Sequence, residues 1–140
     1  MKKTDPSLAR LGNQFLGTWK LSGDASGKTR FEWLEKGVFL QQHFDIKVFG
    51  RRNKGVEIIG RLRPPNQKPS KELWSRSYIF SEGQTFDYVY DLKGNNITIW
   101  FQEKGSSNFF KGKFSSDGKS YSGAWSWPGG GYSVTATKMV

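Results

Sequence analysis

The chain has 140 residues, no cysteine, one histidine and a formal net charge of +10 at pH 7. This length fits one domain with a core of its own, and the missing cysteines exclude disulfide scaffolds and thiolate metal sites. The lone histidine, His43, disfavours a metal or haem centre. Because no disulfide can form, we expect a cytoplasmic location.

The sequence predicts neither a targeting segment nor a membrane-spanning segment. Met1-Lys2-Lys3 is followed by Thr4-Asp5-Pro6-Ser7, where a signal peptide would carry its apolar stretch. No apolar run approaches the roughly 18 residues that a transmembrane helix needs. We therefore expect a soluble protein.

A short helix is predicted near the start of the chain, within residues 1–16. Asp5 is a good N-cap acceptor, and Pro6 suits the first helical position, where a missing N–H costs nothing. Leu8, Leu11 and Phe15 then fall on one face of a helix of about ten residues. We expect this helix to cover one mouth of the structure that follows.

From Gly17 onward the apolar period changes to two, which is typical of β-strands. Short segments follow one another, separated by hairpin turns such as Lys93-Gly94-Asn95-Asn96. One loop, Pro64–Ser70, interrupts this rhythm and holds three of the five prolines. The predicted strands span residues 17–22, 28–35, 38–46, 56–62, 73–80, 84–92, 97–102, 108–114, 119–127 and 131–139.

The gaps between these segments are too short for helical crossovers, so the strands are predicted to pair in sequence as an antiparallel meander. A closed barrel is favoured over a sandwich because closure removes the sheet edges. The predicted fold class is all-β, with residues 1–140 in one domain. In it, the helical segment 1–16 precedes a single antiparallel up-and-down β-barrel of about ten strands, residues 17–140.

Gly17-Thr18-Trp19, at the start of the first strand, indicates how such a barrel closes. The glycine permits a bend and a close approach, and the tryptophan ring can plug one end. The interior of a small barrel is either filled by side chains or holds one small ligand. The pattern is consistent with both.

Six Trp, five Tyr and eleven Phe are more aromatic residues than a core of this size ordinarily uses. Several alternate along one strand face, beside glycine or with a polar tip, as in the wall of a ligand pocket. Simple filling of the barrel is an equally weighted alternative. The residues predicted to line a ligand-binding cavity are Phe31, Trp33, Gln42, Phe44, Arg76, Tyr78, Tyr88, Tyr90, Trp125 and Tyr132.

The register of strand 73–80 stays open at this point. Arg76 and Tyr78 share one face, Ser75 and Ser77 share the other, and either face is compatible with an inward position. An inward Arg76 would require an anionic ligand or an internal carboxylate. Strand 56–62 is predicted to group its apolar positions on one face: Val56, Ile58, Gly60 and Leu62.

The sequence shows no catalytic triad, paired carboxylates or phosphate-binding loop, and we expect no cofactor and no metal site. The leading hypothesis is non-enzymatic binding of a small, mostly apolar ligand, with an anionic group if Arg76 faces inward. The alternative is surface binding of a polyanion or nucleic acid, supported by the +10 charge and by Arg61 and Arg63. A third hypothesis is an enzyme that uses Arg76, Tyr78 and Tyr88.

The run Phe15-Leu16-Gly17-Thr18-Trp19-Lys20-Leu21 resembles the opening strand of the calycins, which include the lipocalins and fatty-acid-binding proteins. In those families the tryptophan closes the barrel base, and a basic residue from near the chain end packs over it. The resemblance therefore implies closure by Gly17, Trp19 and Lys138. Residues 31–37 and 118–125 are similar to small bacterial lipocalin-like domains of unknown function.

The chain departs from two branches of this superfamily. Its last strand, Tyr132 to Met139, has no Arg-x-Tyr pair like that with which fatty-acid-binding proteins hold a carboxylate. Its one such pair is Arg76-Ser77-Tyr78, in a middle strand. No histidine follows His43 to match the proximal ligand of nitrobindin-like haem barrels.

Overall fold

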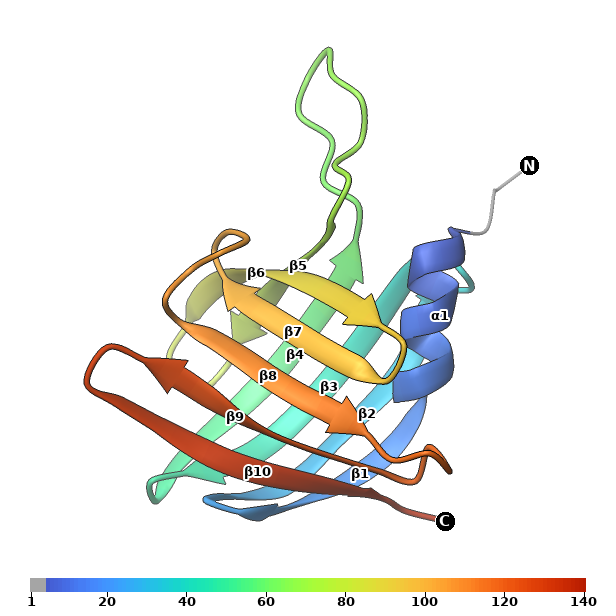
Figure 1. The fold of residues 1–140 in the computed structure, drawn as a ribbon. Coiled ribbons are helices and arrows are strands. Elements are labelled where there is room, and N and C mark those ends of the chain that lie inside the picture. The colour runs from blue at the N-terminus through green and yellow to red at the C-terminus, as the bar shows by residue number, and fades with distance from the viewer. Residues whose placement is uncertain (1–4) are drawn as a thin grey trace.

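Ten antiparallel strands form a closed sheet in the computed structural model, which describes residues 5–140 (Figure 1). The predicted all-β up-and-down barrel with one short helix is confirmed. The first four residues of the expected segment 1–16, including Met1-Lys2-Lys3, lie outside the described residues. The strands are β1 (Gly17–Gly23), β2 (Ala25–Glu35), β3 (Phe39–Val48), β4 (Arg51–Gly60), β5 (Leu73–Ile79), β6 (Gln84–Lys93), β7 (Asn96–Phe101), β8 (Phe109–Phe114), β9 (Ser120–Trp127) and β10 (Gly130–Lys138).

Each strand pairs with its neighbours in the sequence, and the last strand pairs with the first. In this closing ladder between β1 and β10, Trp19 lies opposite Lys138 and Leu21 lies opposite Ala136. Closure leaves no strand edge available to another chain. It also gives the alternate residues of every strand a common interior to face.

Strand β4 begins five residues earlier than the alternation of apolar residues predicts. The turn that joins it to β3 is Phe49-Gly50, and both residues have positive φ, 52° and 73°. Such a tight turn matches the twist of the flanking strands. The ladder therefore continues through the basic segment, with Val48 opposite Arg51.

Helix α1 (Pro6–Phe15) begins where the capping pattern predicts. The Oδ1 atom of Asp5 accepts hydrogen bonds from the backbone N–H groups of Ser7 at 3.0 Å and Leu8 at 3.1 Å. These bonds satisfy two of the donors that every helix start leaves free. The helix lies across one end of the barrel (Figure 1), where it buries Leu8, Leu11, Gly12 and Phe15.

Trp33 supports the helix instead of lining the cavity, which corrects its predicted placement. Its ring lies so close to Gly12 that a Cβ there would come within 2.6 Å of Trp33 Cη2. Only glycine permits this approach of helix and strand. Trp33 does continue the inward face of β2, but its ring packs against Gly12 of α1.

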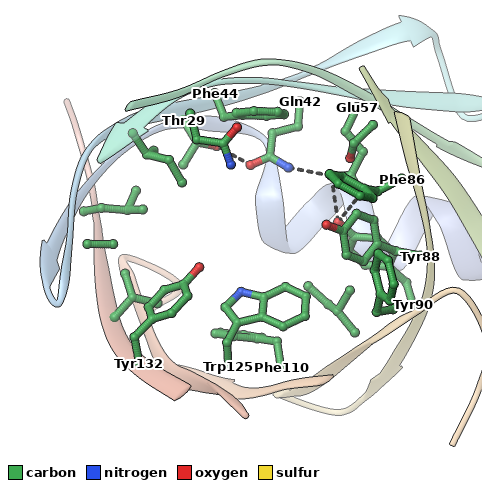
Figure 2. Close-up of a pocket in the computed structure, with 18 of the residues that line it drawn as sticks. Thr29, Gln42, Phe44, Glu57, Phe86, Tyr88, Tyr90, Phe110, Trp125 and Tyr132 are labelled. Atoms are coloured by element: carbon green, nitrogen blue, oxygen red, sulfur yellow. Dashed lines mark hydrogen bonds between the residues drawn. The ribbon is translucent and has the colours of Figure 1, made fainter. Parts of the chain in front are cut away.

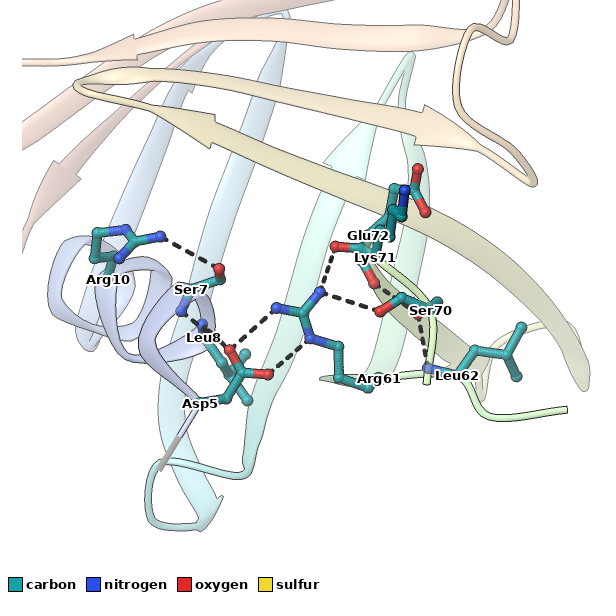
Figure 3. A network of polar contacts seen from close by, with 9 residues as sticks. All are labelled: Asp5, Ser7, Leu8, Arg10, Arg61, Leu62, Ser70, Lys71 and Glu72. Carbon is teal, nitrogen blue, oxygen red and sulfur yellow. Dashed lines mark hydrogen bonds and ion pairs between the residues drawn. The ribbon is translucent and has the colours of Figure 1, made fainter. Parts of the chain in front are cut away.

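Arg61 links the start of the helix to the long β4–β5 connection (Figure 3). Its guanidinium donates to both oxygens of Asp5, at 2.7 and 3.1 Å, and to the carbonyl oxygens of Ser70 and Lys71. The hydrogen bond from Arg61 holds the pKa of Asp5 below its usual value. Arg61 is therefore a structural residue, since only 25% of its side chain is exposed.

Within residues 5–140, no helix has the length and apolar character needed to cross a membrane.

We expect Asp5→Ala to lower the free energy of unfolding by about 1–2 kcal/mol, because the helix loses its cap and Arg61 loses its carboxylate. Urea denaturation at pH 7 measures this difference. Because the folded pKa of Asp5 lies below 3.8, its contribution is present above that pH and is lost as the pH falls through the folded pKa.

Asp5→Ser is the matched control, since its hydroxyl keeps the capping acceptor and loses the ion pair. A loss smaller than that of Asp5→Ala is expected. Equal stability of Asp5→Ala and the unmodified protein would show that this network does not anchor the helix.

Candidate functional site

The end of the barrel beneath α1 is filled. Trp19 is fully buried, and its indole Nε1 donates a hydrogen bond to the carbonyl oxygen of Phe15 at 2.7 Å. Lys138 Nζ lies 5.6 Å from the centroid of the Trp19 ring, within cation–π distance. Gly17 has a φ of 120°, which favours glycine, and its Cα lies against the Lys138 side chain, because a Cβ there would lie 2.8 Å from Lys138 Cε. The three residues of the calycin-like closure therefore meet at one place.

Phe15 separates this filled end from the open part of the interior. Its ring stacks on Phe31 at 4.4 Å and meets the edges of Phe114 and Tyr121 at 5.0 and 5.6 Å. The buried Phe15 side chain also contributes to the cavity surface. Helix α1 thus supplies the floor of the cavity.

A cavity of about 430 Å³ occupies the rest of the barrel interior (Figure 2). Its wall consists mostly of aromatic and aliphatic side chains, into which a few polar groups are set. Seven residues predicted as ligand-binding lie in this wall, and their contact with a ligand stays a prediction. They are Phe31, Gln42, Phe44, Tyr88, Tyr90, Trp125 and Tyr132.

Aromatic rings surround the end of the barrel opposite α1. Phe86, Phe101 and Trp127 line the cavity there and are half-buried. Phe49, in the β3–β4 turn, is 70% exposed, and its ring lies 5.9 Å from that of Tyr132. An apolar rim of this kind suits the entry of an apolar molecule.

Arg76 and Tyr78 lie on the outer face, which corrects their predicted place in the cavity. The guanidinium of Arg76 forms a two-bond pair with Asp87 on the neighbouring strand, at 2.8 and 3.2 Å. Outside the barrel this pair stays hydrated, whereas an inward Arg76 would lose its water. The inward residues of β5 are Leu73, Ser75, Ser77 and Ile79, all buried.

Glu57 is the polar residue of the cavity wall that the alternation pattern misses, and it is 3% exposed. Gln42 Nε2 donates to its Oε1 at 2.5 Å, and Ser75 Oγ donates to its Oε2 at 2.6 Å. The Tyr90 hydroxyl lies 2.8 and 2.7 Å from the two carboxylate oxygens. Thr29 completes the chain of bonds by donating to Gln42 Oε1 at 2.9 Å (Figure 2).

The predicted apolar face of β4 is not the face that lines the interior, because this strand carries apolar residues on both faces. Val56 and Ile58 face outward, while Gly55, Glu57 and Ile59 are the buried inward residues. One sign of the true register is Gln42, a polar side chain on the otherwise apolar face of β3. A buried amide requires a polar partner on an adjacent strand, and Glu57 lies directly opposite Gln42.

The electrostatics of the cavity centre on Glu57. Burial raises the pKa of its carboxyl group, although the hydrogen bonds from Ser75, Tyr90 and Gln42 oppose this shift. Burial also raises the pKa of Tyr88 and Tyr90, and it raises that of Tyr132 to about 12. None of the described residues that line the cavity is a lysine, arginine or histidine.

The side chains that the enzyme hypothesis requires do not come together in the cavity. Arg76 and Tyr78 lie outside the cavity, so they do not meet Tyr88 as the enzyme hypothesis requires. His43 lies on the outer face, where its Nε2 atom is 2.9 Å from Oε1 of Glu32. Among residues 5–140, no three metal-ligating side chains come together.

No protein-family model matches the chain, and no curated protein matches it.

We expect the free energy of unfolding of Glu57→Gln to increase relative to that of the unmodified protein as the pH rises. The pKa of Glu57 is raised above 4.5 in the folded state, so the folded protein binds the proton more tightly than the unfolded chain. Stability contributed by this group is present below pH 4.5 and is lost as the pH rises through the folded pKa.

Urea denaturation of both proteins at several values between pH 4.5 and pH 9 measures this effect. The difference should grow as the pH rises through the folded pKa of Glu57. Parallel stability curves would contradict a buried, ionising Glu57.

Proposed function

We propose that this protein is a calycin-like barrel that binds a small, mostly apolar ligand in its cavity. The observation that carries the proposal is the aromatic-walled cavity of about 430 Å³ in the barrel interior. Small-molecule sites are commonly apolar cavities of roughly 300–1,000 Å³ with a few convergent polar groups. The cavity has both properties.

The size of the cavity is sufficient for useful affinity. Burial of roughly 200 Å² of apolar ligand surface would contribute about 5 kcal/mol at 25 cal/mol per Å². Part of that gain is lost in immobilising the ligand. The rigid walls of a closed barrel limit the further loss from ordering the protein.

The filled end of the barrel supports the calycin assignment within this proposal. Trp19 plugs the barrel beneath α1, and Lys138 from the last strand packs over its ring. This arrangement leaves the opposite end for ligand entry. It is the arrangement that the Gly17-Thr18-Trp19 resemblance implies.

The alternative of polyanion binding on the outer surface has weaker support. Four outward arginines are within ion-pair distance of carboxylates: Arg30 with Glu32, Arg51 with Glu82, Arg52 with Asp45 and Arg76 with Asp87. These pairs interrupt the basic surface that phosphate recognition requires. Binding in the interior should also be nearly independent of salt, whereas binding of a polyanion should weaken steeply with salt.

We expect the fluorescent neutral probe N-phenyl-1-naphthylamine to bind in the cavity, with quenching of tryptophan fluorescence because Trp125 and Trp127 line it. Val134→Phe should weaken this binding at least tenfold, since Val134 faces the cavity and the larger ring occupies its volume. Comparison of native and denaturing mass spectra of the purified protein detects a ligand carried through purification.

Val56→Phe is the matched control, because it makes the same substitution on the outer face of β4. It should leave probe affinity unchanged. Equal affinity of the probe for both variants would place binding outside the cavity and contradict the proposed function.

A further inference from the structure

We propose that the cavity selects ligands that carry a positively charged amine on an apolar body, with Glu57 as the group that recognises the charge. This inference rests on the proposed function and specifies its ligand class. It replaces the expectation of an anionic ligand, which depended on an inward Arg76.

The position of Glu57 is the first argument. Its carboxylate lies in the wall of an otherwise uncharged cavity, nearly removed from water. Among the described residues of that wall it is the one acidic side chain, and no basic side chain accompanies it. A buried carboxylate with no cationic partner is unfavourable, and a bound ammonium group would supply the partner.

The hydrogen bonds around Glu57 are the second argument. Gln42, Ser75 and Tyr90 all donate to the carboxylate, and all three are neutral groups. Thr29 donates to the Oε1 atom of Gln42, which leaves the amide NH₂ directed at Glu57. These donors partly offset the cost of an ionised carboxylate, and because they are neutral they do not cancel its charge.

The aromatic wall is the third argument. Tyr88 and Trp125 meet edge to face at 5.8 Å, and Phe110 packs against Trp125 at 5.7 Å. Figure 2 shows Tyr88, Trp125 and Tyr132 around the same space that Glu57 and Gln42 border. Aromatic faces attract cations and also pack against an apolar body, so both parts of the proposed ligand find partners.

The ionisable groups that face Glu57 are tyrosines from β6 and β9. Burial raises the pKa of Tyr88, Tyr90 and Tyr121, and the negative charge of Glu57 adds to the shift, so these phenols stay neutral across the ordinary pH range. Glu57 is therefore the group whose ionisation controls the charge of the cavity. The outer surface is basic, with a net charge of +10 for the chain, and gives a cationic ligand no general attraction.

Three naphthalene probes of similar size test the inference: 2-naphthylmethylamine, 2-naphthylmethanol and 2-naphthoate. At pH 8 we expect the amine, as its ammonium form, to bind roughly tenfold to a hundredfold more tightly than the alcohol, as charge-assisted hydrogen bonds allow. The naphthoate should bind most weakly. Isothermal titration calorimetry gives all three affinities, and Val134→Phe should weaken each of them.

Glu57→Gln should abolish the preference for the amine while retaining affinity for the alcohol. The hydroxyls of Ser75 and Tyr90 can accept as well as donate, so they can accommodate the new amide. Glu82→Gln is the matched control, since Glu82 lies in the exposed β5–β6 turn and pairs with Arg51. That variant should keep the full preference.

If Glu57→Gln does not fold, a pH series on the unmodified protein provides the same test. The preference for the amine should disappear as the pH falls and Glu57 takes up a proton. Equal affinity for amine and alcohol at pH 8, or a preference that persists in Glu57→Gln, overturns the inference and leaves cavity binding intact. Failure of all three probes to bind the cavity overturns the proposed function as well.

Discussion

The ladder between β1 and β10 is the constraint on which the rest of this structure depends. It joins the two ends of a ten-strand sheet, with Trp19 opposite Lys138, and turns a sheet with two faces into a wall with an inside and an outside. Once the wall is closed, the two-residue period of every strand assigns each side chain to one side. The interior residues then have to fill the barrel or leave a cavity.

The barrel does both, at different ends. Beneath α1, the large rings of Trp19, Phe15 and Phe114 occupy the interior and are almost completely buried. Toward the other end, Tyr132 and Trp125 stand against the wall and are only half-buried. The ion pair between Asp5 and Arg61 holds the helix over the filled end (Figure 3). The helix therefore covers one end of the barrel and leaves the other end uncovered.

The distribution of charge follows the same division. Outward arginines such as Arg52 and Arg76 pair with carboxylates in contact with water, where the charges keep their hydration and pay little desolvation cost. Inside, Glu57 has only neutral donors around it. The exterior of the barrel is basic, whereas the cavity wall carries one acidic side chain among the described residues, Glu57. The proposed ligand class follows from the charge of the cavity and not from that of the exterior.

The sequence by itself determined the elements: the helix from its cap and period, the ten strands from their alternation and turns, and closure from Gly17 and Trp19. It did not determine which face points inward where both faces carry apolar residues, as in β4 and β5. That choice was made by tertiary structure, because Glu57 finds its hydrogen-bond donors on three different strands and Arg76 finds Asp87 only on the outside. These partners lie 11 to 33 residues apart along the chain, and the pairing of their strands in the sheet brings them within bonding distance.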